Sequence, residues 1–335
     1  CKSQKSLNKR LLTYNVLCLI NNMKIIITGG TGFIGSGLAE KLLDDNHELL
    51  LITRNNNKNS NIANFADKIK IEYCDVTNEK KMTEIILDSA PDAIFHFAGQ
   101  LTTYESFEKP FYDVDANCKS TLIILESIRK LNKKCRFLLG STFWVIGKSD
   151  NLPVDENSPC NPRNIYAADR LASENYCSIY KLVYDLDTIV LRFTNTYGEK
   201  EQYLNPKKAA LNYLLYKAHI GEDVPIYSKG EFFRDYIHVK DVISACKLVL
   251  EKGISGETYF VGTGIKTWFN NIAKIIEKLR NAKIMFIDPP PYHKKIDIGN
   301  FVIDNTKLKK LGWEPTIDIE TGIKSIFDYF ERLNK

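Results

Sequence analysis

From Met23 onward, short runs of β-branched and other apolar residues alternate with longer stretches in which apolar residues recur every three or four positions. The short runs, such as KIIIT at 24–28, are typical of parallel strands that are covered on both faces. The longer stretches, such as FIGSGLAEKLLDD at 33–45, have the spacing of amphipathic helices. This alternation predicts strand–helix–strand units with right-handed crossovers, and therefore an open parallel sheet.

Further strands are predicted at 47–53, 68–74, 92–98, 136–142 and 187–193, with helices at 78–89, 114–132 and 165–184. After about residue 195 the rhythm loosens, and prolines, glycines and long polar stretches appear. One more strand–helix unit is expected at 232–252, followed by helices at 268–280 and near 319–333. The asparagine-rich stretch 54–65 is interpreted as a solvated loop.

A glycine-rich turn, GGTGFIG at 29–35, follows the first predicted strand and opens the first predicted helix. Gly29, Gly32 and Gly35 allow a tight turn and bring backbone N–H groups close to a pyrophosphate at the helix N-terminus. In this strand–turn–helix context the pattern predicts a dinucleotide cofactor. The second strand ends near Arg54, which either holds the 2′-phosphate of NADP or is a solvated arginine at a loop edge.

Together these elements predict an α/β fold, a Rossmann-type doubly wound parallel sheet with a smaller, mixed α/β C-terminal substrate lobe. We expect residues 23–194 to form the dinucleotide-binding domain, with 236–262 returning to it, and residues 195–335 to form mainly the second lobe. Residues 1–22 are expected to be an appendage outside the fold, because the first strand begins near Met23. Their apolar run LLTYNVLCLI is too short to span a membrane.

The composition excludes several other classes of protein. With 335 residues, 44% of them hydrophobic and 26% charged, the chain is typical of a soluble globular protein. A net charge of +5 is too small for the basic surface of a nucleic-acid binder. The eight cysteines contain no Cys-x-x-Cys pair and the five histidines no metal-ligand spacing. We therefore expect no metal site, and free thiols in a reducing, cytoplasmic environment.

Seven motifs then occur in an order that resembles the extended short-chain dehydrogenases/reductases. Within that group the chain is most similar to the NAD(P)-dependent nucleotide-sugar epimerases and dehydratases, and it looks like the UDP-glucose 4-epimerases. The resemblance covers residues 23 to about 330. The motifs are GGTGFIG (29–35), CDVT (74–77), HFAG (96–99), IYAADR (165–170), LRFTNTYG (191–198), RDYIHVKD (234–241) and LGWEP (311–315).

The resemblance implies a role for each matching position. Tyr166 matches the catalytic tyrosine, Thr142 matches the residue that hydrogen-bonds the reacting sugar hydroxyl, and Arg170 stands where the family has lysine. Asn195 and Arg234 match residues that hold the nucleotide diphosphate. Contacts with NAD or NADP are implied for Phe33 and Ile34 at the pyrophosphate, Asp75 and Val76 at the adenine, Phe97, Ala98, Gly99 and Gln100 at the end of the fourth strand, Asn117 on the helix behind, and Tyr166 and Arg170.

The residue types at these positions suit hydride transfer at a sugar carbon, which needs a base to take the hydroxyl proton as the carbonyl forms. A free tyrosine titrates at about 10, so Tyr166 needs a nearby positive charge to ionise at neutral pH. Arg170 lies four residues later, on the same face of the predicted helix, and keeps its charge at any relevant pH. Its planar guanidinium cannot copy the compact ammonium of lysine, so we expect a working but slower site.

Phe143 and Trp144 follow Thr142, where family dehydratases have an aspartate and a glutamate that exchange protons with the sugar. Neither aromatic residue can do this, so a 4,6-dehydratase is not expected. The sequence favours a nucleotide-sugar epimerase that acts at C4 through a transient 4-keto sugar. An NADPH-dependent reductase of a nucleotide-linked 4-keto-6-deoxy sugar, favoured by Arg54, stays open. So does a catalytically quiet protein that binds NAD(P) or a nucleotide sugar, favoured by Arg170.

Family members often pair through the two helices that carry the asparagine and the tyrosine, and a homodimer is therefore expected. The run STLIIL at 120–125 is apolar enough to contribute to such an interface.

Overall fold

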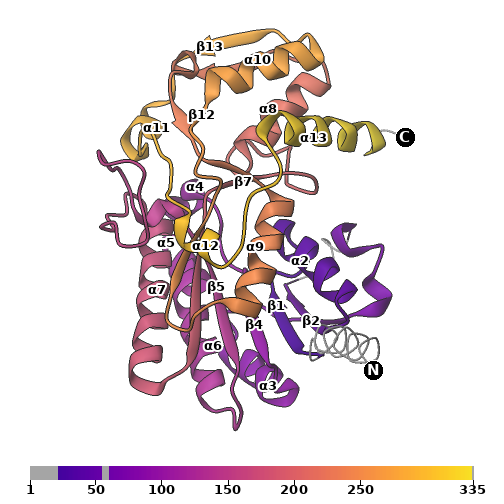
Figure 1. The fold of residues 1–335 in the computed structure, drawn as a ribbon, viewed down its shortest axis with the longest axis vertical. Helices are drawn as coiled ribbons and strands as arrows, with labels where there is room; N and C mark the ends of the chain where they lie inside the picture. The colour runs from indigo at the N-terminus through magenta and orange to yellow at the C-terminus, as the bar shows by residue number, and fades with distance from the viewer. Residues whose placement is uncertain (1–21, 55–59, 334–335) are drawn as a thin grey trace, which may run out of the picture.

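The computed structural model describes residues 22–54 and 60–333. Its centre is a parallel sheet of seven strands in the order β11-β6-β5-β4-β1-β2-β3, which confirms the predicted α/β fold class (Figure 1). The first six strands along the chain lie within the predicted strand segments. The seventh lies much later in the chain and begins at residue 258. The strands are β1 (Lys24–Thr28), β2 (Glu48–Thr53), β3 (Lys70–Tyr73), β4 (Ala93–His96), β5 (Arg136–Thr142), β6 (Asp187–Phe193) and β11 (Thr258–Val261).

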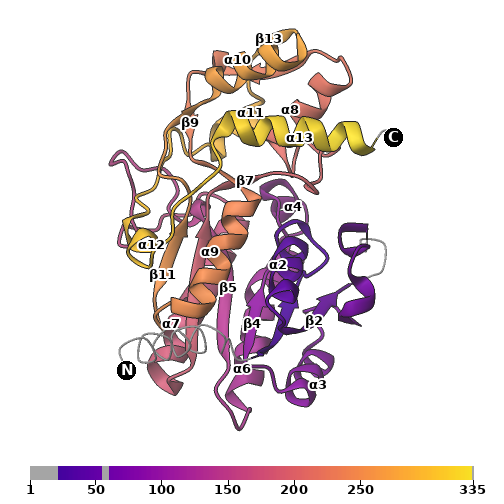
Figure 2. The same ribbon diagram turned by 45° about the vertical axis from the view of Figure 1, so that its right-hand side comes forward.

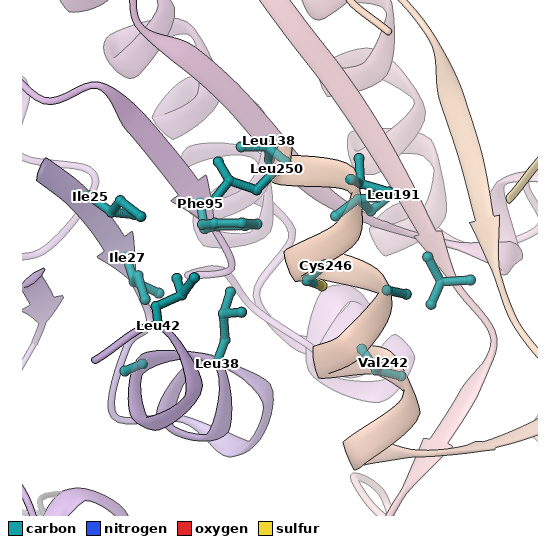
Figure 3. Packing of buried hydrophobic residues seen from close by; sticks show 14 of the residues in the cluster. Ile25, Ile27, Leu38, Leu42, Phe95, Leu138, Leu191, Val242, Cys246 and Leu250 are labelled. Carbon is teal, nitrogen blue, oxygen red and sulfur yellow. The ribbon is translucent and has the colours of Figure 1, made fainter. Parts of the chain in front are cut away.

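Helices cover both faces of this sheet (Figure 2). On one face lie α2 (Phe33–Asp44) and α9 (Val239–Lys252), which pack against each other. Their buried side chains, among them Leu38, Leu42, Val242, Cys246 and Leu250, meet Ile25, Ile27, Phe95, Leu138 and Leu191 from the strands (Figure 3). The other face is covered by α3 (Glu79–Ser89), α6 (Ser120–Arg129) and α7 (Ile165–Tyr184).

The smaller lobe lies above the carboxyl ends of the strands and has its own apolar core (Figure 1). Three helices build that core, α8 (Ala210–His219), α10 (Phe269–Arg280) and α13 (Ile319–Leu333). Three two-stranded sheets accompany them, in which β8 (Val224–Tyr227) pairs with β13 (Ile284–Ile287), β7 (Asn195–Tyr197) with β10 (Tyr236–His238), and β9 (Phe233–Arg234) with β12 (Thr267–Trp268).

Short helical segments make up the remaining connections. They are η2 (Ala66–Lys68), α4 (Thr103–Glu108), α5 (Pro110–Asp113), η3 (Val114–Lys119), η4 (Phe143–Val145), η5 (Ser228–Gly230), α11 (Pro291–Ile296) and α12 (Thr306–Lys310).

Two buried aspartates of the RDYIHVKD motif tie the lobe to the sheet. The Asp235 carboxylate accepts hydrogen bonds from the backbone N–H groups of Thr263 and Gly264, which follow β11. The Asp241 carboxylate accepts from the backbone N–H groups of Thr316 and Ile317, just before α13. The motif therefore fixes where the chain crosses between the two parts of the molecule.

Three expectations need correction. The predicted helix 114–132 divides into a π-helical turn, η3, and the shorter α-helix α6. The stretch 54–65 is more than a solvated loop, because Ile62 and Phe65 are buried in the core. The run STLIIL is almost entirely buried inside the chain, with only Leu122 partly accessible, because it packs on the sheet and on α3. It therefore cannot supply much of a dimer interface.

The appendage predicted at residues 1–22 lies, except for residue 22, outside the described residues. Within 22–54 and 60–333, no helix is both long and apolar enough to cross a membrane. The six cysteines in these ranges are free thiols.

Candidate active site

The glycine-rich turn joins β1 to α2 and forms part of a cleft of about 350 Å³ at the carboxyl end of the sheet. Gly29 has a φ of 70°, which a residue with a side chain rarely adopts. A Cβ atom at Gly29 would lie 2.9 Å from the backbone nitrogen of Ala98, and one at Gly35 only 2.3 Å from the carbonyl oxygen of Gly29. The turn is thus so tight that these positions accept only glycine.

This turn leaves the N-terminus of α2 open towards the cleft. Gly32 caps the helix without a side-chain hydrogen bond, and the first turn contains no acidic residue. The first N–H groups of a helix have no partner within it, and the helix dipole makes this end attractive to anions. Phe33, Ile34 and Gly35, which line the cleft here, therefore form a suitable cradle for a pyrophosphate.

Most of the residues that the sequence assigned to the cofactor come together in this cleft. They are Gly29, Gly32, Phe33, Ile34, Gly35, Arg54, Val76, Phe97, Ala98 and Gly99.

Five other predicted cofactor residues do not line the cleft; two of them, Tyr166 and Arg170, lie on α7, and the other three are Asp75, Gln100 and Asn117. The Asp75 carboxylate accepts hydrogen bonds from the backbone N–H and hydroxyl of Thr77, and so closes a local turn. The Gln100 amide donates to the carbonyl oxygen of Thr102 at 2.8 Å and is buried. Asn117 is fully buried in η3, and its amide donates to Asp113 at 3.0 Å. These side chains support the walls of the cleft from behind.

Sequence reasoning missed the segment from Thr196 to Lys208, which also lines the cleft. The Lys200 ammonium donates to the carbonyl oxygen of Asn61 at 3.0 Å and lies 3.4 Å from the Glu40 carboxylate on α2. The Lys208 ammonium lies 3.5 Å from the Glu105 carboxylate on α4. The segment therefore makes contact with both sides of the cleft, although its sequence is typical of a polar linker.

Tyr166 and Arg170 lie one turn apart near the start of α7, with Arg170 Cζ 5.8 Å from the centre of the tyrosine ring. The helix begins after Asn164, whose side chain accepts a hydrogen bond from the backbone N–H of Ala167 at 2.8 Å. This cap fixes the first turn and with it the place of Tyr166. Only 2% of Arg170 is exposed, so its charge is held inside the protein.

The Arg170 guanidinium has a charged and polar environment but few direct partners. Its Nε and Nη1 atoms have no hydrogen-bond partner among the described residues, and neither has the side-chain oxygen of Asn117. The carboxyl groups of Asp113 and Asp169 interact with its charge. Buried donors are rarely left unpaired in proteins, so these atoms mark a place for a ligand with hydrogen-bonding groups.

The carboxyl groups of Asp113 and Asp169 also lie close enough to influence each other's charge. Burial raises the pKa of both, and the neighbouring Asp113 carboxyl helps to raise the pKa of Asp169 to about 7. Two carboxyl groups this close do not both ionise readily, so the pair holds a proton near neutral pH. Its remaining negative charge offsets the charge of Arg170.

Thr142 is the last residue of β5, and its hydroxyl accepts a hydrogen bond from the backbone N–H of Trp144 at 3.3 Å. Phe143, which follows it, is buried and lies with its ring centre 4.8 Å from that of Phe301. The position after Thr142 is therefore part of an apolar cluster, and Trp144 packs beside it.

Asn195 and Arg234 lie where the second lobe meets the sheet. The Asn195 amide donates to the carbonyl oxygen of Asp235 at 3.0 Å. The Arg234 guanidinium donates to the Asp297 carboxylate at 2.7 Å and to the carbonyl oxygen of Phe233 at 3.1 Å. Arg234 is thus already paired, and a bound phosphate would have to share it with Asp297 or displace Asp297.

The residues of this site fit a nicotinamide dinucleotide. The glycine cradle and the open helix end suit its pyrophosphate, and the unpaired donors of Arg170 and the unpaired oxygen of Asn117 suit a group with hydroxyls. Within residues 22–54 and 60–333 no cluster of histidine, cysteine, aspartate or glutamate is arranged to hold a metal ion.

Comparison with known proteins agrees with this geometry. A family model described as GDP-mannose 4,6 dehydratase matches residues 26–326. A putative UDP-glucose 4-epimerase of Methanocaldococcus jannaschii is 30% identical over 315 residues, which cover 93% of this chain and 99% of that protein.

Solved structures give the same result. The UDP-glucose 4-epimerase of Thermotoga maritima, determined with UDP-glucose, has a TM-score of 0.86 and 28% identity, and the match covers 93% of this chain and 100% of that one. The UDP-glucose 4-epimerase of Thermus thermophilus in complex with NAD has a TM-score of 0.82 and 25% identity, over 92% and 99% of the two chains. The chain therefore belongs to the NAD-dependent nucleotide-sugar epimerase/dehydratase family of extended short-chain dehydrogenases/reductases.

Proposed function

We propose that this protein is a nucleotide-sugar epimerase that inverts C4 through a transient 4-keto sugar. The observation that carries the proposal is the pair of aromatic residues after Thr142. Loss of water from the sugar needs an acid and a base, and Phe143 and Trp144 can exchange no proton. Because Phe143 is also buried against Phe301, no acidic side chain could stand there without repacking the cluster.

The remaining residues are sufficient for an epimerase. In the proposed reaction the phenolate of Tyr166 takes the proton of the C4 hydroxyl, and the resulting phenol later returns it to the same oxygen. The Arg170 cation lies one helical turn from Tyr166, and in the proposed reaction the Thr142 hydroxyl hydrogen-bonds the reacting oxygen. A nicotinamide cofactor bound in the cleft supplies a hydride acceptor and donor. The keto sugar rotates in the site between the two hydride transfers, so that the hydride returns to the opposite face of C4.

The substrate class is proposed from the lobe that faces the cleft. Arg234 offers a planar cation suited to a diphosphate, and Asn195 lies beside it at the junction of the lobes. A relative with the same fold was determined with UDP-glucose, which supports a uridine- or thymidine-linked hexose as the first substrate to test.

A second candidate is an NADPH-dependent reductase of a nucleotide-linked 4-keto-6-deoxy sugar. Arg54 favours it, since this cation lines the cleft at the end of β2, where the adenosine ribose lies in folds of this kind. The Arg54 guanidinium hydrogen-bonds the Tyr112 hydroxyl. This contact holds Arg54 in place to bind a 2′-phosphate.

The two candidates differ in whether the cofactor is consumed. The purified protein is incubated with a panel of UDP- and dTDP-linked hexoses, with traces of NAD or NADPH, while sugar isomers and nicotinamide absorbance are followed together. A new C4 isomer without net change of the cofactor is the expected result. Stoichiometric oxidation of NADPH with a 4-keto sugar would establish the reductase instead. A 4-keto-6-deoxy product from a nucleotide-linked glucose would contradict both, and cofactor binding without turnover would favour a binding protein.

A further inference from the structure

Gly99 lies directly against the Arg170 guanidinium. A Cβ atom built at Gly99 would lie 2.4 Å from Arg170 Nη2 and 2.3 Å from the side-chain oxygen of Asn117. Both distances are far below ordinary contact distances between heavy atoms. Here the backbone conformation is not the constraint, because Gly99 is absent from the residues with positive φ. The absence of a side chain at Gly99 therefore serves to make space.

Part of this space is needed because of the arginine, and the Asn117 oxygen takes up the rest. Counted along the side chain, the Nζ atom of a lysine corresponds to the Cζ atom of an arginine, so a lysine has nothing at the place of Nη2. Arg170 Cζ would be 3.3 Å from the added Cβ, which a small shift can relieve. The severe contact with residue 170 thus comes from the extra nitrogen that distinguishes arginine from lysine.

The guanidinium has no free room to move away from an added methyl group. Asp113 and Asp169 interact with it from the helical elements α5 and α7, and Asn117 is held to Asp113 by its amide. Only 2% of Arg170 is exposed, and the side chains of Asn117 and Asp113 are fully buried. A substitution at Gly99 would therefore push the cation out of the place beside Tyr166.

We propose that Gly99 is a positioning residue for Arg170, and that glycine at 99 is what allows arginine to stand at 170 in place of lysine. The proposal extends the proposed function. It depends on that function only through the role of Arg170 in the reaction. Positions 99 and 170 then form a coupled pair, in which the cost of a side chain at 99 depends on the residue at 170.

The test is a cycle of four proteins: wild type, Gly99→Ala, Arg170→Lys and the double variant. With arginine at 170, Gly99→Ala is expected to lower kcat/KM by about 100-fold, the loss that a misplacement of about 1 Å in a catalytic site can cause. In the Arg170→Lys background the same change should cost less than about fivefold, since contacting residues deviate from additivity. In the double variant the contact with the Asn117 oxygen is left but the contact with Nη2 is gone, because a lysine has no atom at that place.

Gly37→Ala is the matched control. Its added Cβ would also lie 2.4 Å from a neighbour, but that neighbour is the flexible end of Ile243, away from Tyr166 and Arg170. We expect it to have the same small effect in both backgrounds. An equal loss from Gly99→Ala with arginine and with lysine would overturn the proposal, and so would an active Gly99→Ala enzyme that keeps Arg170.

Two further readouts keep this test independent of the sugar. The midpoint of thermal unfolding and the Kd for NAD, measured by protein fluorescence, are determined for all four proteins. If the Gly99→Ala protein does not fold, recovery of folded protein in the double variant supports the coupling, and failure of both contradicts it. If the wild type turns over no nucleotide sugar, the proposed function fails, while coupling in Kd or thermal midpoint still supports the pairing of Gly99 with Arg170.

Discussion

The positive charge beside Tyr166 is permanent, because arginine does not lose its proton at any pH at which the protein is folded. The nearby His96 adds nothing to that charge. It is fully buried between the hydroxyls of Thr28 and Ser120, and burial together with Arg170 lowers the pKa of His96 to about 3. Of these two basic side chains, Arg170 therefore supplies the positive charge near Tyr166, and the acid pair Asp113–Asp169 offsets part of it.

Replacing Tyr166 by phenylalanine tests the role of the phenol directly. The ring and its packing are kept while the group that exchanges the proton is lost. We expect kcat/KM to fall by about 10²- to 10⁴-fold, the usual contribution of a general acid or base. The Kd for NAD serves as the control and should change little. Full activity of the Tyr166→Phe protein would show that the catalytic residue lies elsewhere.

The positions of the glycines, which depend on the backbone, were predicted more accurately than the contacts of polar side chains. Gly29 and Gly35 lie where their spacing predicted, because a tight turn into a helix leaves them no alternative. Asp75 and Gln100 are bonded to their own local backbone, which no motif could indicate. Lys200 lines the cleft, but it comes from a part of the chain whose sequence has no periodic pattern of apolar residues.

Asp169 on helix α7 and Asp113, the last residue of α5, form the acid pair, so the stability of the packing between α5 and α7 should depend on pH. The pKa of Asp169 is raised to about 7 in the folded protein, mainly by burial and next by Asp113. The unfolded chain ionises this group at about 3.9. Folding therefore favours the protonated acid, and that stability is present below pH 4 and is lost as the pH rises towards 7 and above.

Asp169→Asn should consequently raise the thermal midpoint above pH 7, because asparagine resembles the protonated acid and does not titrate. The difference from the wild type should shrink towards pH 5, as measured by thermal unfolding across a pH series. Asp185→Asn is a useful control of opposite sign. The ion pair with Lys181 lowers the pKa of that exposed carboxylate, so its loss should bring no gain at alkaline pH. A constant difference at every pH for Asp169→Asn would contradict the assignment.

Among the elements, the central strands could be predicted closely because β-branched runs bounded by polar residues leave little choice of register. Strand β6 and helix α7 have the bounds that their patterns predicted, Asp187–Phe193 and Ile165–Tyr184. Over the six residues of η3, by contrast, side-chain periodicity cannot distinguish a π-helical from an α-helical turn. Ile62 and Phe65 are isolated apolar residues among asparagines, and only the finished core reveals their burial.

The whole molecule retains an apolar surface on the outer side of α7. Leu182 is 84% exposed, Val183 59% and Ile179 49%, and Phe111 at the start of the neighbouring helical segment is 86% exposed. Isolated exposed apolar residues are common, but several on adjacent helices favour an interface with another protein surface. A second copy of this chain is the partner we expect.

Light scattering after size exclusion should therefore give the mass of a homodimer. Replacing Leu182 and Val183 by glutamate should shift the mass to that of the monomer, because charges would be buried between the two copies. Ile254, which is 60% exposed but lies in the turn after α9, offers a matched control. Its replacement by glutamate should leave the dimer intact. A monomeric wild type would rule out this interface.

The sheet is completed by a strand from late in the chain, since β11 at 258–261 pairs with β6 only after the chain has passed through α8 and returned. Helix α9 on the same return path covers Leu138 and Leu191. During synthesis on the ribosome, one edge of the strand Asp187–Phe193 therefore stays unpaired until more than 60 further residues have emerged. The two lobes are thus interleaved along the chain, and the first lobe corresponds to no single continuous stretch of the sequence.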